Sequence, residues 1–296
     1  MSKILVIGVG GAGRETVKHM KDAGIPEADY ITFGNFENDE RKDIPHYNLI
    51  TMNGHCGISP THRPSVFKHL AENVEDDIRE VLEYHINYTD LPEEKSANMV
   101  NDKIKGVIFG QAIGDALGLG TEFMTKKEVN KYYPNGLAYY DQIIQDYHRK
   151  RWEKGAWTDD TDMMLCIANA IIKDKDIKLS TIAQNFKDWF NGEPLGIGNN
   201  TFKVLSFKDY TDNPQKGAEI IWNLSGKKSA ANGAVMRTSV VGLWNNDTEK
   251  YATEICKLTH YDPRCVGSCA IISLLINNLV YKNQMLSLEQ LIEIDR

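Results

Sequence analysis

The chain has 296 residues, of which 42% are hydrophobic and 25% charged, and this composition excludes a disordered or low-complexity chain. With 34 basic and 41 acidic residues the formal net charge is −7, so nucleic acid is not an expected partner. Five irregularly spaced cysteines favour reduced thiols over a disulfide framework. The first residues have no signal-peptide pattern, and polar residues interrupt the longest apolar stretch, 270–280. We therefore expect no membrane partner and a cytoplasmic location.

The first part of the chain has an α/β pattern. A buried strand is predicted at 3–8, and a glycine-rich turn and a helix reaching Lys21 follow it. A second strand is predicted at 30–34. Apolar residues at helical spacing predict an amphipathic helix at 65–84. The pattern is that of a Rossmann-like α/β segment.

The glycine-rich turn has the sequence GVGGAG and matches G-x-G-x-x-G between a strand and a helix. Glycines at these positions allow close backbone approach, and the N-terminus of the following helix attracts a phosphate. A dinucleotide-binding fold also needs an acid about 20 residues further on. Glu37 is a late candidate for that acid. A nicotinamide-dependent oxidoreductase is therefore one alternative for this segment.

The N-terminal segment also has a family resemblance. The stretches KILVIGVGGAGRETVKHM, YITFGNFEND and ENVEDDIREVLE together resemble the start of FtsZ, the tubulin-like GTPase of bacteria, over about residues 3–84. The resemblance implies a tubulin/FtsZ-type fold in which Gly10, Gly11 and Asn35 correspond to nucleotide contacts. The family's later GGGTGTG loop is absent from this sequence, so GTP hydrolysis is not expected. The segment is then a partner-binding or decoy module, or a domain that only packs.

The predicted domain organisation follows from a change in composition along the chain. The α/β segment occupies 1–88, and the polar, proline-containing stretch 89–102 is predicted to be a linker. Strand signals nearly vanish after it, so an all-α domain is predicted at 103–296. Its helices are expected at 103–119, 159–173, 180–190, 232–243, 248–259 and 263–280.

The first helix of the second domain contains four glycines at intervals of four residues. They are Gly106, Gly110, Gly114 and Gly118. Each costs a helix about 1 kcal/mol relative to alanine, so the pattern predicts that another helix approaches closely. Asp115 within the helix and Glu122 just after it would then lie beside tightly packed backbone.

An acidic cluster opens the helix predicted at 159–173, in the sequence GAWTDDTDMM. Acids at a helix N-terminus cap free N–H groups and complement the helix dipole, which is one interpretation. Asp159, Asp160 and Asp162 also repel one another, and a bound cation would offset their charge. With the Thr158 hydroxyl they offer hard oxygen ligands, which favour Mg²⁺, Ca²⁺ or Mn²⁺ over zinc. The spacing leaves a cap and a metal site equally open.

Five motifs occur in order in the second part: GQAIGDALGLGTEF, GAWTDDTDMML, GIGNNTFKVL, ANGAVMR and LTHYDPR. Together they resemble the ADP-ribosylglycohydrolase family, over about residues 101–296. The resemblance implies an all-α fold with a centre of two Mg²⁺ ions, or Mn²⁺ in some members. It further implies cleavage of the glycosidic bond between ADP-ribose and a modified side chain, most often arginine.

The same resemblance implies roles for individual residues. The metal ligands of the W-[ST]-D-D-T motif correspond to Thr158, Asp159 and Asp160. The metal-linked catalytic carboxylate corresponds to Glu122. The stretch along the ADP-ribose phosphates corresponds to Gly196, Gly198, Asn199, Asn200 and Thr201. The residues that line the ligand pocket correspond to Asn232, Gly233, Met236 and His260.

Several motif residues also have purely structural interpretations. Arg237 is predicted to form a salt bridge. Asp262 and Arg264 would cap and begin the next helix. Trp157 is expected to pack in the core, and His260 outside its motif would be a structural histidine.

The family's second metal motif, G-D-x-D-[ST], is not found before Arg296. The sequence is therefore either a fragment of a longer protein or a member with weakened catalysis. The expected function is a Mg²⁺-dependent hydrolase that removes ADP-ribose from protein side chains. Its substrate partner is an ADP-ribosylated protein, and the FtsZ-like segment suggests an immunity protein that binds an ADP-ribosyltransferase toxin or a cell-division protein. The alternative is an ADP-ribose-binding or toxin-blocking protein without turnover.

Overall fold

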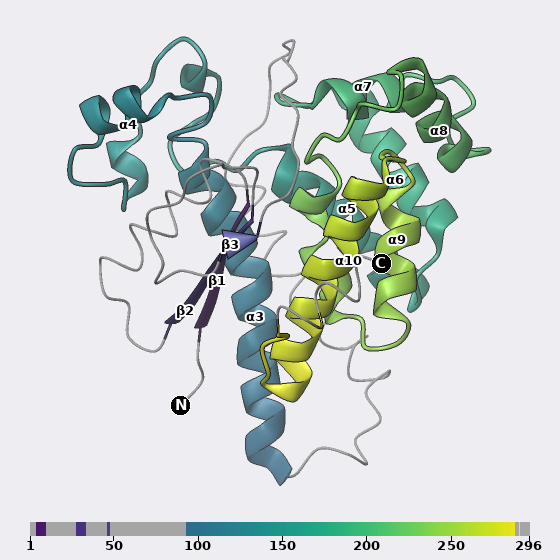
Figure 1. Cartoon of the computed structure of the whole chain (residues 1–296), viewed down its shortest axis with the longest axis horizontal. Coiled ribbons are helices and arrows are strands. Elements are labelled where there is room, and N and C mark those ends of the chain that lie inside the picture. The colour runs from purple at the N-terminus through teal and green to yellow at the C-terminus, as the bar shows by residue number, and fades with distance from the viewer. Residues whose placement is uncertain (1–3, 10–27, 34–45, 48–92, 288–289, 291–296) are drawn as a thin grey trace. The chain divides into compact units, whose positions relative to one another are not determined.

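The computed structural model describes residues 4–9, 28–33, 46–47, 93–287 and 290 (Figure 1). The chain divides into two compact units. Unit 1 contains residues 1–51 and 109–158, and unit 2 contains residues 52–108 and 159–296. The predicted helices that reach Lys21 and span 65–84 lie outside the described residues, as do Gly10, Gly11 and Asn35.

Three strands of unit 1 form a parallel sheet in the order β1-β2-β3. They are β1 (Ile4–Val9), β2 (Ala28–Phe33) and β3 (His46–Tyr47). Ile4 pairs with Ala28, and Thr32 pairs with His46. Strands thus form close to both predicted places, shifted by one or two residues. The tubulin/FtsZ-type fold of the whole segment remains a prediction.

The helix α3 spans Glu93–Gly118, so it begins inside the stretch predicted to be a linker and well before residue 103. Pro92 directly precedes it, and proline is favoured where a helix starts. Part of the stretch 89–102, which was predicted to be a linker because it is polar and contains proline, is thus helical.

The glycine stripe of α3 has no close neighbour in the part of the chain that the structure describes. A Cβ atom at Gly106, Gly110, Gly114 or Gly118 would meet no atom within 4 Å. The first three of these glycines are exposed. The predicted close approach of a second helix is therefore not found among the described residues.

Alanine at Gly110 is accordingly expected to raise the free energy of unfolding by about 1 kcal/mol, because alanine loses less backbone entropy in a helix. Urea unfolding of the whole chain measures this change. The matched control is Gly120→Ala, whose Cβ would lie 2.3 Å from Leu137 Cδ2 and 3.0 Å from the Leu117 carbonyl oxygen. That variant should be destabilised by about 1–3 kcal/mol. A loss of stability in Gly110→Ala would mean that another part of the protein covers this face.

After α3, unit 1 continues through short helices around a small core. These helices are α4 (Lys126–Tyr132) and two 3-10 helices, Tyr140–Gln142 and Arg149–Arg151. Leu117, Tyr133, Leu137 and Ile143 form the core cluster. The Tyr133 hydroxyl donates to the Gly120 carbonyl at 2.9 Å and so ties the end of α3 to this core.

The described residues of unit 2 contain no strand, which confirms the all-helical prediction for them. The α-helices from residue 159 onward are α5 (Asp159–Asp174), α6 (Leu179–Asn191), α7 (Asn199–Leu205), α8 (Pro214–Leu224), α9 (Thr248–Cys256) and α10 (Pro263–Asn277). A π-helical segment, Asn278–Lys282, follows α10. The stretch predicted as one helix at 232–243 instead forms two 3-10 helices, Val235–Arg237 and Ser239–Leu243.

In unit 2 the helix α10 packs against α9 (Figure 1). The 3-10 helix Ser239–Leu243 also packs against α10. Only glycine fits at Gly242, where a Cβ would lie 2.6 Å from Ile276 Cβ. The polar residues within 270–280 predict that this stretch does not span a membrane, but by length and composition Pro263–Lys282 could cross one. Within this segment, 56% of the most apolar 18-residue stretch is buried inside the protein, as in the core helix of a globular fold.

Candidate functional site

Thr158 is held by an acid of α3. Its backbone N–H donates to Asp115 Oδ2 at 2.9 Å, and its hydroxyl donates to Asp115 Oδ1 at 2.8 Å. The hydroxyl proton is thus committed to Asp115, and the hydroxyl oxygen can still act as an acceptor or as a ligand. Asp115 therefore orients a hydroxyl oxygen immediately before α5 begins.

The three acids of the cluster all lie in the first turn of α5. Asp162 Oδ2 accepts a hydrogen bond from the Trp189 indole at 3.1 Å, so this carboxylate ties α5 to α6. Asp159 and Asp160 are half-buried. They follow Thr158 directly in the chain, and hydroxyl and carboxylate oxygens are the ligand types that Mg²⁺ prefers. Among the described residues no group of three or more His, Cys, Asp or Glu residues is arranged to hold a metal ion, so Mg²⁺ at these oxygens stays a prediction.

Glu122 lies just after α3, and its side chain is 40% exposed. The Nε2 atom of His148 lies 2.7 Å from Glu122 Oε2, and Arg151 Nη2 lies 2.6 Å from His148 Nδ1. Because a guanidinium can only donate, Nδ1 accepts from Arg151 and Nε2 carries the proton that it donates to Glu122. His148 therefore orients the predicted catalytic carboxylate. No motif in the sequence marked His148 for this role.

Arg149 holds the loop that carries Glu122. Its side chain is 3% exposed. Its Nε donates to the carbonyls of Leu119 and Gly120, at 2.9 and 3.0 Å. One Nη donates to the Glu122 carbonyl, and the other forms an ion pair with Asp146. The guanidinium thus satisfies three carbonyls where α3 ends, which fixes the backbone on which Glu122 sits.

The predicted phosphate-binding stretch runs into α7. Gly198 and Asn199 are exposed, and Gly198 is the N-cap of α7. The Asn200 amide donates to the Thr259 carbonyl at 2.9 Å and accepts from the Ser229 hydroxyl at 2.8 Å. Asn200 therefore joins the stretch to the loops that precede Asn232 and His260.

Three of the predicted ligand residues meet at one buried point. Thr201 and His260 are each 1% exposed. A Cβ at Gly233 would lie 3.0 Å from His260 Nε2 and 3.0 Å from Thr201 Oγ1, so only glycine fits there. Neither of these two atoms has a hydrogen-bond partner among the described residues. Burial, with a smaller effect of the Arg237 charge, lowers the pKa of His260 to about 3, so the imidazole is neutral at neutral pH.

Arg237 forms no salt bridge in the part of unit 2 that the structure describes, so that prediction was wrong. Its guanidinium is buried, with its centre 4.3 Å from the centroid of the Phe186 ring. One Nη donates to Thr259 Oγ1 at 2.6 Å and the other contacts Met163 Sδ at 3.4 Å. A hydroxyl, a thioether and an aromatic face take the place of the expected carboxylate.

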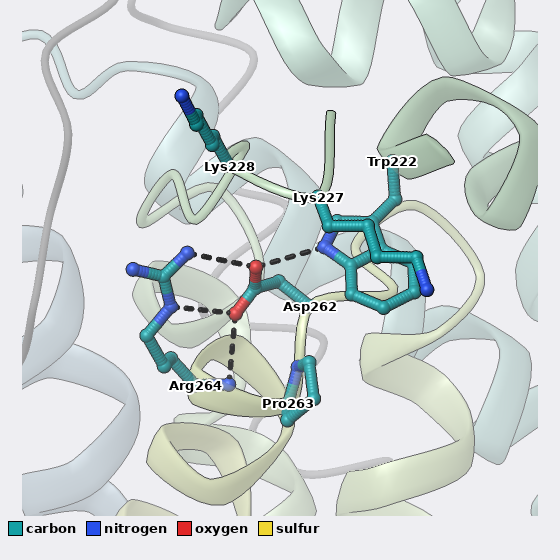
Figure 2. A pocket seen from close by; sticks show the side chains of 6 residues that line it. All are labelled: Trp222, Lys227, Lys228, Asp262, Pro263 and Arg264. Atoms are coloured by element: carbon teal, nitrogen blue, oxygen red, sulfur yellow. Dashed lines mark hydrogen bonds and ion pairs between the residues drawn. The ribbon is translucent and has the colours of Figure 1, made fainter. Parts of the chain in front are cut away.

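Asp262 caps α10, as predicted. Its Oδ1 accepts from the backbone N–H and the Nε of Arg264, at 3.0 and 2.8 Å. Its Oδ2 accepts from Arg264 Nη2 and from the Trp222 indole, both at 2.8 Å (Figure 2). Burial would raise the pKa of Asp262, but these hydrogen bonds outweigh it and lower that pKa. The carboxylate is thus a structural anchor.

A surface recess of about 480 Å³ surrounds this anchor. Figure 2 shows the side chains that line it, which are Trp222, Lys227, Lys228, Asp262, Pro263 and Arg264. Arg264 is engaged by Asp262, and Lys227 Nζ lies 5.2 Å from the centroid of the Trp222 ring. The recess contains none of the residues predicted to bind metal or ADP-ribose.

The predicted residues thus fall into separate groups. Thr201, Gly233 and His260 meet, and Asn200 is bonded to the residue before His260. Met236 is buried, whereas Asn232 is exposed. The side chain of Glu122 contacts His148, which was not predicted.

Residues 96–295 match the profile of the ADP-ribosylglycohydrolase family, described as ADP-ribosylglycohydrolase. The match covers more than half of the chain, and the chain belongs to this family. The family was predicted from five motifs, and this prediction is confirmed.

The individual relatives of this chain have low sequence identity to it. The chain is 27% identical over 192 residues to the ADP-ribosyl-(dinitrogen reductase) glycohydrolase of Rhodospirillum rubrum. This alignment covers 61% of this chain and 59% of that protein. The chain is 27% identical over 207 residues to the ADP-ribosylarginine hydrolase Tri1 of Serratia proteamaculans, covering 64% and 50%. It is also 34% identical over 83 residues to the cell division protein FtsZ of Methanothermobacter thermautotrophicus, covering 28% and 22%. The chain thus spans 59% of the length of the first hydrolase and 50% of the length of the second.

Proposed function

We propose that this protein is a Mg²⁺-dependent hydrolase that removes ADP-ribose from modified protein side chains, with arginine as the linkage. The observation that carries the proposal is the family membership, together with the oxygens that open α5. Two relatives are named for the removal of ADP-ribose from dinitrogen reductase and from arginine, which supports the substrate class.

The predicted metal ligands and the predicted catalytic carboxylate each have a proposed chemical role. Thr158, Asp159 and Asp160 would hold Mg²⁺, with Mn²⁺ as a substitute, and the ion would supply electrostatic stabilisation at the ribose. Glu122 would accept a proton from the water whose oxygen bonds to the anomeric carbon, in an oxocarbenium-like transition state. The C–N bond to the guanidinium would break in the same step, and the guanidine would leave with the electron pair and then take up the proton. His148 Nε2–H donates to Glu122 Oε2 and would hold this carboxylate in place for the step.

The test is release of ADP-ribose from an arginine-ADP-ribosylated protein, in Mg²⁺ and in EDTA. We expect release in Mg²⁺, loss of release in EDTA, and recovery when Mg²⁺ or Mn²⁺ is added back. Asp159→Ala should abolish release, whereas Asp212→Ala, at an exposed position of the same unit, should not. Release that persists in EDTA would contradict the metal role.

The second candidate is a protein that binds ADP-ribose, or blocks a toxin, without turnover. The observation that favours it is that no group of three or more His, Cys, Asp or Glu residues among those described is arranged to hold a metal ion. The partial likeness to FtsZ is the basis for proposing an immunity role against a toxin that modifies a cell-division protein. A folded protein that binds ADP-ribose and releases none would support this candidate over the hydrolase.

A further inference from the structure

A chain of buried hydrogen bonds leads from Arg237 to His260. Arg237 Nη2 donates to Thr259 Oγ1 at 2.6 Å, and Thr259 Oγ1 lies 2.8 Å from His260 Nδ1. All three side chains are buried. They belong to the same unit, and the bonds join the 3-10 helix Val235–Arg237 to the loop before α10.

The direction of the hydrogen bonds follows from which groups can donate. A guanidinium has no acceptor atom, so Thr259 Oγ1 must accept from Arg237. The hydroxyl then has one proton to donate, and His260 Nδ1 is the acceptor in reach. The opposite tautomer would leave that buried hydroxyl proton without this acceptor, which is costly. His260 therefore carries its proton on Nε2.

The surroundings of His260 also keep it neutral. The charged group that faces it is Arg237, and the Cys256 thiol donates to the His260 carbonyl at 3.4 Å. A carboxylate beside the imidazole would stabilise an added proton. Among the described residues no carboxylate contacts the His260 ring. Burial and the nearby cation both lower the pKa of His260.

The Nε2–H group points to the place where His260, Gly233 and Thr201 meet. Both His260 Nε2 and Thr201 Oγ1 are buried without a hydrogen-bond partner among the residues described. A buried polar group without a partner is rare in a native protein and calls for an explanation. Thr201 Oγ1 also lies 4.0 Å from where a Cβ at Gly198 would be, so the exposed backbone of the phosphate-binding stretch borders this point.

We infer that Arg237 and Thr259 are positioning residues that hold His260 as an Nε2–H donor. That His260 and Thr201 face ADP-ribose is what the family resemblance implies, and this part rests on the proposed function, whereas the tautomer does not. A water molecule offers the same chemistry, and the experiments distinguish the two.

The tautomer is tested in the full chain by long-range ¹H–¹⁵N NMR after labelling its eight histidines with ¹⁵N. The His260 signals are those that disappear in His260→Gln. We expect one ring proton, on Nε2, from about pH 5 to about pH 8, where an ordinary histidine would titrate. Thr259→Val, which keeps the side-chain shape, should mix the tautomers, and Arg237→Met should do the same if it folds. A proton on Nδ1 in the wild type, or an imidazolium at pH 5, would overturn the inference.

The ligand contact is tested by calorimetry with ADP-ribose as the probe. His260→Leu should weaken binding at least about tenfold, the effect of losing one strong hydrogen bond. His260→Gln, whose amide N–H replaces Nε2–H, should bind about fivefold more tightly than His260→Leu. In the wild type, ADP-ribose should shift the Nε2–H resonance.

Two results would overturn the ligand contact. One is ADP-ribose binding without a shift of that resonance, which would assign the point to water. The other is equal affinity in His260→Leu and the wild type. If the wild type bound no ADP-ribose, the proposed function would fail with the ligand contact, while the NMR result would still decide the roles of Arg237 and Thr259.

Discussion

Replacing Glu122 with Gln is expected to lower the rate of ADP-ribose release by roughly 10²- to 10⁴-fold, the range for a general acid or base. Gln has the same size and can still accept the hydrogen bond from His148, but it cannot take up a proton from water. The free energy of unfolding should therefore stay near that of the wild type. Single-turnover release in Mg²⁺ measures the rate, and urea unfolding measures the stability.

Two further variants make this result specific. Glu153→Gln changes an exposed acid of the same unit and should leave the rate unchanged. His148→Ala removes the bond that orients Glu122 and should slow release roughly tenfold, as expected for one hydrogen bond to a charged group. Unimpaired release by Glu122→Gln would assign the proton transfer to another group.

Replacing Arg149 with Met is expected to lower the free energy of unfolding by roughly 3–5 kcal/mol, the usual cost of breaking a buried charged network. Met retains most of the aliphatic volume, so the loss comes from the hydrogen bonds. Three carbonyls at the end of α3 would lose their donor, and Asp146 would lose its ion pair. Urea unfolding of the whole chain measures the change.

The control for Arg149 is its neighbour in sequence. Lys150→Met removes a cation that is exposed, and its effect should stay within about 0.5 kcal/mol. Arg149→Met should also slow ADP-ribose release, because the Glu122 loop loses its anchor, whereas Glu122→Gln should slow release without loss of stability. A fully stable Arg149→Met protein would show that the carbonyls find other donors.

The elements predicted correctly are those with a long or strong local pattern. The helix α5 follows from the apolar spacing after its acidic first turn, and α10 from a long apolar run that begins at Pro263. The short helices α4, α7 and α8 were missed, since two or three turns give too few periodic positions. At 232–243 the apolar residues suggested one helix, but Gly242 packs against Ile276 and the chain forms 3-10 turns there.

In the candidate site, too, some residues could be identified from local sequence and others could not. The family, the acids that open α5 and the residues Thr201, Gly233 and His260 were found from motifs, because these residues lie in short runs of characteristic sequence. Arg237 was misjudged because an arginine in a sequence suggests a carboxylate partner, whereas its partners are a hydroxyl and a thioether.

Local sequence thus determines the helical second part, the family and the set of candidate residues, because each is encoded by neighbours in the chain. Tertiary structure alone reveals which side chains support them. His148 contacts Glu122 from 26 residues away, and Arg237 contacts Thr259 from 22 residues away. No periodicity or motif links such pairs, since they meet only where separate helices and loops pack together. The direction of each hydrogen bond then follows from the donors and acceptors that packing brings within reach.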